Sequence, residues 1–139
     1  PYFNELYTAE KGKGSFLNKK RIKVSNTNKL NKAFVIVDMA IRNAGSKNIK
    51  ITKKLNNKIY DFRSLGSAVY NYVLVAKGDA DAYIASSTNA WDVAAGALIV
   101  EEAGGKVTSH NGEKWFPENK KFLTGNGKIN KGLLRLLRS

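Results

Sequence analysis

The sequence contains no cysteine and a single histidine in its 139 residues. Disulfide bonds and thiolate zinc sites are therefore excluded, and a cluster of histidines around a metal cannot form within one chain. No apolar run reaches the roughly 20 residues that a membrane-spanning helix needs, and the start lacks the pattern of a signal peptide. We expect a cytoplasmic protein with one hydrophobic core, because the length suits a single domain.

Acidic residues are scarce as well, since 24 lysines and arginines stand against 11 aspartates and glutamates, for a net charge of +13. The excess lies in residues 1–60, which hold 14 basic and 3 acidic side chains, whereas residues 61–139 hold 10 and 8. A basic part of this kind attracts phosphate groups. It lacks the interleaved exposed aromatic residues of single-strand binders, so a solvated surface is the better interpretation and nucleic acid is not the expected partner.

The most informative segment that is present covers residues 90–105, Ala-Trp-Asp-Val-Ala-Ala-Gly-Ala-Leu-Ile-Val-Glu-Glu-Ala-Gly-Gly. Its apolar spacing and closing glycine pair predict a helix over 92–103, with Asp92 at the N-cap or in the first turn. A carboxylate there can simply cap the helix. It can also hold a hard cation such as Mg²⁺, while the free N–H groups beside it attract phosphate.

The remaining patterns predict an α/β protein with a mixed sheet, helices on its faces and a β-hairpin in front. The hairpin consists of strands over 6–9 and 21–25 around a glycine-containing turn at 11–14. Strand and helix then alternate, which favours helices packed on a sheet. The predicted strands cover 33–39, 59–62, 80–85, 106–110 and 122–124, and the other predicted helices cover 45–56, 66–76 and 129–138.

Residues 90–105 resemble the C-terminal signature of the inositol monophosphatase family, a Trp-Asp-x-Ala-Ala-Gly motif that leads into a helix ending Glu-Ala-Gly-Gly. Further segments follow that family's order. They are the hairpin region 5–25, Arg-Ser-Leu-Gly-Ser-Ala at 63–68, Val-Ala-Lys-Gly-Asp-Ala-Asp-Ala-Tyr at 75–83 and Phe-Leu-Thr-Gly-Asn-Gly at 122–127. Together these segments span nearly the whole chain.

The resemblance implies the C-terminal αβα part of the family's fold and the activity of a Mg²⁺-dependent phosphomonoesterase. It also implies that Asp92 is one metal ligand and that Gly66, Ser67 and Ala68 contact a phosphorylated small-molecule substrate. The family's other metal ligands come from a Gly-Glu-Glu motif and an Asp-Pro-(Ile/Leu)-Asp-Gly-Thr motif, and the sequence contains neither. The two prolines, Pro1 and Pro117, do not follow an aspartate.

We therefore expect the second half of a phosphatase that is inactive without its first half. In this view residues 1–25 form a hairpin that joins the sheet of the missing half, and residues 26–139 form the C-terminal α/β domain. A homodimer is possible for such a protein. His110 precedes an Asn-Gly turn, where an exposed histidine is expected rather than a general base.

The substrate stays open at this stage because Ala85 occupies a position where many family members have an acidic residue that contacts sugar hydroxyls. Ser86 and Ser87 follow it, and their hydroxyls could contact a polyol or a ribose, or form only a polar loop. Inositol phosphate, fructose bisphosphate and a nucleotide phosphate all remain candidates. A function from another class is a non-catalytic α/β module that binds anionic ligands or a protein partner through the basic N-terminal part.

Overall fold

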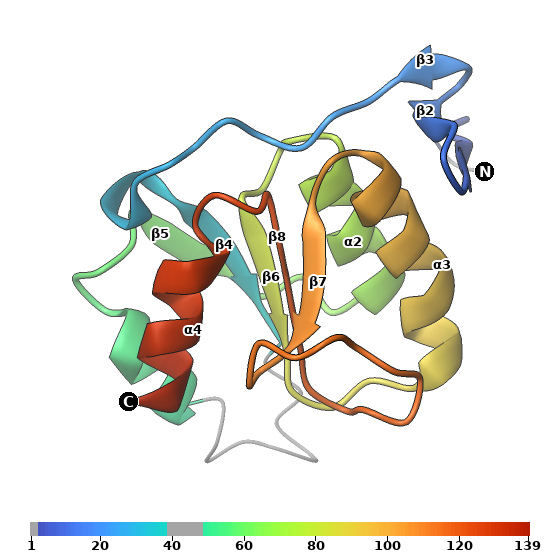
Figure 1. Ribbon diagram of the computed structural model, residues 1–139. Coiled ribbons are helices and arrows are strands. Elements are labelled where there is room, and N and C mark those ends of the chain that lie inside the picture. Colours follow the sequence, from blue (N-terminus) through green and yellow to red (C-terminus); the bar gives the residue numbers. More distant parts are fainter. Residues whose placement is uncertain (1–2, 39–48) are drawn as a thin grey trace.

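A mixed five-stranded sheet in the order β5-β4-β6-β8-β7 forms the centre of the molecule (Figure 1). The computed structural model describes residues 3–38 and 49–139. Strand β4 pairs in parallel with β5 and β6, whereas β8 runs antiparallel to β6 and β7. The predicted α/β class with a mixed sheet is confirmed. The strands are β4 (Phe34–Val37), β5 (Asp61–Arg63), β6 (Ala82–Ala85), β7 (Lys106–Ser109) and β8 (Phe122–Gly125).

Helices cover both faces of this sheet, which gives three layers (Figure 1). On one face lie α2 (Ala68–Ala76) and α3 (Ala90–Glu102), and on the other lie α4 (Asn130–Arg138) and the helical residues 49–55. Successive residues of a strand point to opposite faces. In β6, accordingly, Tyr83 belongs to the core beneath α2 and α3, and Ile84 to the core beneath α4.

A glycine brings α2 and α3 close together. A Cβ atom at Gly96 would lie 2.5 Å from the Tyr72 ring, so a larger residue would force the two helices or the ring to move. The Tyr72 ring in turn meets the Tyr83 ring edge to face, with centroids 5.3 Å apart. This packing fixes where the two helices begin relative to the sheet.

The N-terminal region forms a separate antiparallel sheet of β1 (Tyr7–Glu10), β2 (Gly14–Leu17) and β3 (Lys20–Arg21). The predicted pairing of 6–9 with 21–25 is wrong, because β1 pairs with β2 and β2 then pairs with β3. Asn18 and Lys19 both have positive φ angles, 47° and 68°, and form a two-residue turn between β2 and β3. Such turns usually contain glycine, and neither Asn18 nor Lys19 is one, so this turn was not predicted.

The hairpin is attached to the end of α3. The N–H groups of Gly12 and Gly14 both donate to the Glu102 carboxylate, each over 2.8 Å, and these bonds lower the pKa of that carboxyl group. Two apolar side chains in front of β1 are largely exposed, Phe3 at 71% and Leu6 at 67%. A role of residues 1–25 in joining another sheet stays a prediction.

Most predicted element boundaries shift by one to two residues. The helix expected at 66–76 begins at Ala68, the helix expected at 92–103 begins at Ala90, and the strand expected at 59–62 covers Asp61–Arg63. Of the helix expected at 45–56, residues 49–55 are helical and residues 45–48 lie outside the described part. Within the described residues, none of the helices is long and apolar enough to cross a membrane.

Candidate functional site

The carboxyl ends of the parallel strands β4 and β6 meet at one edge of the sheet. Asp38 directly follows β4, and its N–H donates to the Ile84 carbonyl of β6 over 2.9 Å. Ser86 and Ser87 directly follow β6. In open α/β sheets, ligands bind at this edge because the loops there bring polar groups together.

Helix α2 begins beside this edge. Gly66, with a φ of 80° in the left-handed region that favours glycine, precedes the N-cap residue Ser67, whose hydroxyl accepts the Tyr70 N–H over 3.4 Å. The first N–H groups of a helix lack helical partners, and together with the helix dipole they favour an anion. Residues 66–68 thus have the backbone arrangement that can receive a phosphate group.

Helix α3 supplies Asp92, which the structure places in the first turn rather than at the cap. The N-cap is Asn89, and its carbonyl accepts the Asp92 N–H over 3.0 Å. The Asn89 side chain makes no capping hydrogen bond, and the half-buried Asp92 carboxylate lies in the first turn, where the helix dipole favours a negative charge. The ion pairs among the described residues use Glu10, Asp61 and Asp79 as acids, so Asp92 is not neutralised in this way.

These elements enclose a cleft of about 390 Å³, which we call the acidic cleft. It brings together five of the six residues predicted for the site, all except Ser86. Ser86 lines a different hollow on the other face of the sheet, because neighbouring residues after a strand turn to opposite sides. The acidic cleft is lined by Gly66, Ser67, Ala68, Ser87 and Asp92, and also by Asp38, Val69, Asn71, Tyr83 and Thr88.

Two carboxylates act on the same phenol in the acidic cleft. Burial raises the pKa of Tyr83, and the charges on Asp38 and Asp92 raise it further. Burial and the charge on Asp92 also raise the pKa of Tyr72. Both phenols are therefore neutral near pH 7. A cleft with two carboxylates and no lysine or arginine among its described lining residues attracts a cation, even in a strongly basic protein.

Two buried polar atoms at the acidic cleft have no hydrogen-bond partner in the described part of the chain. They are Asn71 Oδ1 and Thr88 Oγ1, on residues that are 2% and 6% exposed. Buried polar atoms in folded proteins are nearly always hydrogen-bonded to protein or water. These two atoms are thus available to water or to a ligand in the cleft.

The oxygen atoms of the acidic cleft fit part of a Mg²⁺ site. Mg²⁺ in proteins is usually held by one or two carboxylates, with waters and substrate phosphate completing its six ligands. Asp38 and Asp92 are carboxylates of this kind, and Thr88 adds a hydroxyl. Across residues 3–38 and 49–139, no three histidine, cysteine, aspartate or glutamate side chains come together to hold a metal. The ligand set that the described residues offer is therefore incomplete.

Asp38 is the residue that sequence reasoning missed. The apolar run Phe34-Val-Ile-Val37 predicted a buried strand, and Asp38 was included in that strand rather than read as its end. The sequence feature that could have indicated Asp38 is its position directly after a buried parallel strand. Residues at that position lie at the edge of the sheet where ligands bind. The structure places Asp38 in the same cleft as Asp92.

A model of the inositol monophosphatase family matches residues 1–139. The chain belongs to the inositol monophosphatase family. The relationship covers the hairpin, the sheet and all helices described above, and it agrees with the resemblance seen in the sequence.

Several relatives of the inositol monophosphatase family show the extent of the match. A putative Nus factor SuhB of Neisseria meningitidis is 36% identical over 99% of this chain and 53% of its own length. A fructose-1,6-bisphosphatase/inositol-1-monophosphatase of Thermotoga maritima is 33% identical, over 99% and 52%. The solved inositol monophosphatase of Anabaena (Nostoc) superposes with a TM-score of 0.92 at 32% identity, over 99% and 56%. The chain thus spans about half the length of these relatives.

Proposed function

We propose that this chain carries the Asp92-bearing part of the active site of a Mg²⁺-dependent phosphomonoesterase. The observation that carries the proposal is the acidic cleft, where two carboxylates and the beginning of α2 line the same 390 Å³ space. A carboxylate pair favours a hard cation, and a helix N-terminus favours a phosphate. A site that holds both is suited to phosphate-ester hydrolysis.

Asp92 and Asp38 are the residues that would hold Mg²⁺, with the Thr88 hydroxyl beside them. Bound Mg²⁺ would lower the pKa of a water molecule and neutralise charge on the phosphate oxygens. The N–H groups that begin α2, next to Ser67, would position the phosphate. The neutral hydroxyl of Tyr83 can donate a hydrogen bond to an oxygen in the cleft, which an ionised phenolate could not do.

The ligand set requires further carboxylates, and we propose that they come from a partner segment outside this sequence. The family membership and the half-length coverage of the relatives support this idea. The β1–β3 sheet is a suitable place for such a segment or for a second copy, because β1 and β3 are its outer strands and Leu6 is exposed. By itself the chain should bind Mg²⁺ weakly and hydrolyse essentially nothing.

The substrate is a phosphate ester of a small sugar, an inositol or a nucleotide. Ala85 is fully buried in the core and offers no acidic contact to a sugar, so sugar hydroxyls would meet Ser87 or Thr88 instead. A relative named as both a fructose-1,6-bisphosphatase and an inositol-1-monophosphatase is consistent with a broad substrate range.

The test measures Mn²⁺ or Mg²⁺ binding and phosphate release for the protein and for Asp92→Asn. We expect weak metal binding that Asp92→Asn abolishes, and negligible phosphate release from inositol phosphate, fructose bisphosphate and adenosine monophosphate. Asp79→Asn is the matched control, because Asp79 is exposed and paired with Lys77. Metal binding that Asp92→Asn leaves unchanged would contradict the proposal, and so would enzyme-like turnover by this chain that survives the substitution.

A non-catalytic binding module is the second candidate. It is favoured by the net charge of +13 and by relatives whose names describe a Nus factor rather than an enzyme. In this case the basic N-terminal part would contact an anionic ligand or a protein partner. Binding of that kind would not depend on Mg²⁺, and Asp92→Asn would leave it unchanged.

A further inference from the structure

A second hollow lies at the same edge of the sheet but on the face covered by α4 and residues 49–55. Its volume is about 300 Å³, and we call it the basic groove. Its described lining contains no acidic side chain. Three lysines line it, together with a serine, a histidine and two apolar side chains: Lys50, Lys54, Lys121, Ser86, His110, Ile51 and Leu137.

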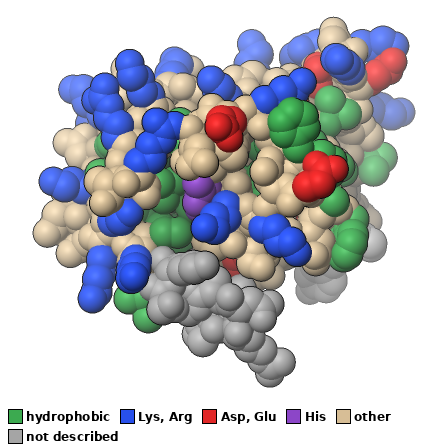
Figure 2. All heavy atoms as spheres, turned by 60° about the horizontal axis from the view of Figure 1, so that its bottom comes forward, with side chains coloured by type: hydrophobic (Ala, Val, Ile, Leu, Met, Phe, Trp, Pro, Cys, Tyr) green, Lys and Arg blue, Asp and Glu red, His purple; other side chains and the backbone are tan. Residues whose placement is uncertain are grey.

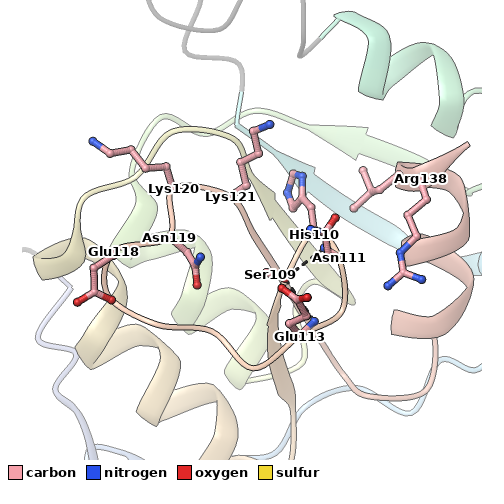
Figure 3. A pocket seen from close by; sticks show the side chains of 10 residues that line it. Ser109, His110, Asn111, Glu113, Glu118, Asn119, Lys120, Lys121 and Arg138 are labelled. Atoms are coloured by element: carbon pink, nitrogen blue, oxygen red, sulfur yellow. Dashed lines mark hydrogen bonds between the residues drawn. The ribbon is translucent and has the colours of Figure 1, made fainter.

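Positive charge continues beyond the groove. Figure 2 shows lysine and arginine side chains around the histidine on this face of the molecule. An adjoining hollow of about 510 Å³ shares His110, Lys121 and Leu137 with the groove. It adds Lys120 and Arg138, and also two acidic side chains, Glu113 and Glu118. In Figure 3, Lys121 and His110 project beside each other, and Arg138 faces them from the end of α4.

The three lysines of the basic groove form no ion pair with the described acidic residues. The ion pairs formed among the described residues use Lys13, Arg63 and Lys77, and none of the groove lysines. Lys54 Nζ donates to the carbonyl of Leu137 over 2.9 Å, which holds the ammonium group at the groove without neutralising it. Like charges around one hollow repel each other, and an anion placed between them relieves that repulsion.

One buried polar group points to a ligand rather than to a merely charged surface. Ser86 is 8% exposed, and its hydroxyl has no hydrogen-bond partner in the described part of the chain. His110 is half-buried, so the prediction that it is exposed is wrong; its Nε2 contacts the Phe122 carbonyl at 3.2 Å. Burial lowers the pKa of His110, and Lys121 lowers it further, so the ring is neutral near pH 7.

We propose that the basic groove binds a phosphate group, either free phosphate or the phosphoryl group of a small molecule. Lys50, Lys54 and Lys121 surround the anion, and the Ser86 hydroxyl donates to one of its oxygens. Lysine ammonium groups bind phosphate as point charges. A volume near 300 Å³ is at the lower end of the range for small-molecule pockets, roughly 300–1,000 Å³, so it has room for more than phosphate alone.

This site is distinct from the acidic cleft. Ser86 and Ser87 are neighbours in the chain, but the first lines the basic groove and the second lines the acidic cleft. The acidic cleft needs a metal ion before it can attract phosphate, because Asp38 and Asp92 repel an anion. The basic groove needs none. Binding measured in EDTA therefore excludes the acidic cleft, whether or not the chain is part of a phosphatase.

The experiment titrates the protein in EDTA with inorganic phosphate and with adenosine monophosphate, followed by calorimetry and by ³¹P NMR. Lys50→Gln combined with Lys121→Gln should weaken binding about tenfold or more, the loss expected for one or more charge-assisted contacts. Lys131→Gln is the control, since Lys131 is exposed at the start of α4. The Lys131→Gln and Asp92→Asn variants should both bind phosphate as the unmodified protein does.

A second variant, Ser86→Ala, should weaken phosphate binding, because it removes a hydrogen-bond donor from the groove. The melting temperature should stay nearly unchanged, because the Ser86 hydroxyl has no hydrogen-bond partner among the described residues. Tighter binding of adenosine monophosphate would identify a phosphorylated small molecule as the ligand, whereas equal binding would identify free phosphate. An equal loss in Lys131→Gln would overturn the site, since it would show a general charge effect. Absence of saturable binding up to millimolar concentrations, or binding of an oligonucleotide alone, would overturn it too.

Discussion

The acidic cleft and the basic groove occupy the same edge of one sheet and have opposite charge. The cleft lies beside α2 and α3 and contains Asp38 and Asp92, while the groove lies beside α4 and contains three lysines. Strand β6 separates them, and the alternation of its side chains continues into Ser86 and Ser87. One strand end can thus serve two sites whose chemistry differs, because the two faces of a sheet do not share their side chains.

The two regions also differ in how their charges are assembled. The carboxylates of the acidic cleft come directly after β4 and in the first turn of α3, so rigid elements hold them close to the sheet. The lysines of the basic groove come from residues 49–55 and from the segment before β8, and Lys50 and Lys121 are exposed. Fixed carboxylates suit a metal ion, which demands defined geometry, whereas long lysine side chains suit an anion of variable shape.

The largest expected effect is the loss of activity when the acidic cleft loses the negative charge of Asp92. In a protein that also contains the proposed partner segment, Asp92→Asn should lower Mg²⁺-dependent phosphate release by ~100-fold or more. Loss of a residue that only orients a metal ligand already lowers activity by about 10–100-fold. Stability should change by less than about 1 kcal/mol, the usual size of a helix-dipole effect. Kinetics at several Mg²⁺ concentrations and a melting curve provide the check. Normal turnover with an unchanged Mg²⁺ requirement would end the metal-ligand assignment.

A smaller effect concerns folding stability, which should depend on how tightly the helices pack on each face of the sheet. Gly96→Ala should destabilise the fold by roughly 1–2 kcal/mol, because overpacking costs about 1–3 kcal/mol and alanine regains up to ~1 kcal/mol of helix propensity. The reason is the contact with the Tyr72 ring at 2.5 Å. Urea denaturation measures the change.

Gly132→Ala on the opposite face is the matched control. Its Cβ would meet the Leu30 side chain, 2.6 Å from the Cδ1 atom, and that flexible end can turn away. Its cost should therefore be close to zero. Equal destabilisation by both substitutions would show that the α2–α3 contact is no tighter than the packing of α4.

The next effect concerns the second carboxylate of the cleft. Asp38→Asn should weaken Mg²⁺ binding by about tenfold, a smaller loss than for Asp92→Asn, and phosphate binding to the groove in EDTA should stay the same. Titration with Mn²⁺ followed by electron paramagnetic resonance measures metal binding by both variants, and calorimetry in EDTA measures phosphate binding. If the Asp38 variant bound metal like the wild-type protein, Asp38 would be a neighbour of the site and not a ligand.

The smallest expected effect concerns His110, which lines the basic groove, and the pH dependence of folding stability. Burial lowers the pKa of His110 below its ordinary value of 6.5, so the unfolded chain takes up a proton more readily than the folded one. Stability should therefore fall as the pH drops below about 6.5. In His110→Gln the fall between pH 7 and pH 5.5 should be shallower, as denaturation at both values would show. An identical slope would mean that His110 is not the titrating group.

Much of the site could be predicted from the sequence because its residues lie at the ends of regular elements. Asp92 and Gly66 to Ala68 mark helix beginnings, and five of the six predicted residues line one cleft. Ser86 was expected beside Ser87, but sequence proximity does not tell on which side of a sheet a residue lies. Strand β2 was missed for a local reason, since the Asn18-Lys19 turn lacks the glycine that usually signals such a turn.

The sequence alone determined the α/β class and the family resemblance, and it singled out Asp92 as a candidate, because hydrophobic periodicity and short motifs are local properties of the chain. The tertiary structure alone decided that Asp38 joins Asp92, although 54 positions separate them in the sequence. It also decided that Lys50, Lys54 and Lys121 meet beside Ser86 in the basic groove. Both gatherings follow from strand order and helix packing, which place distant residues together through contacts that no local pattern encodes.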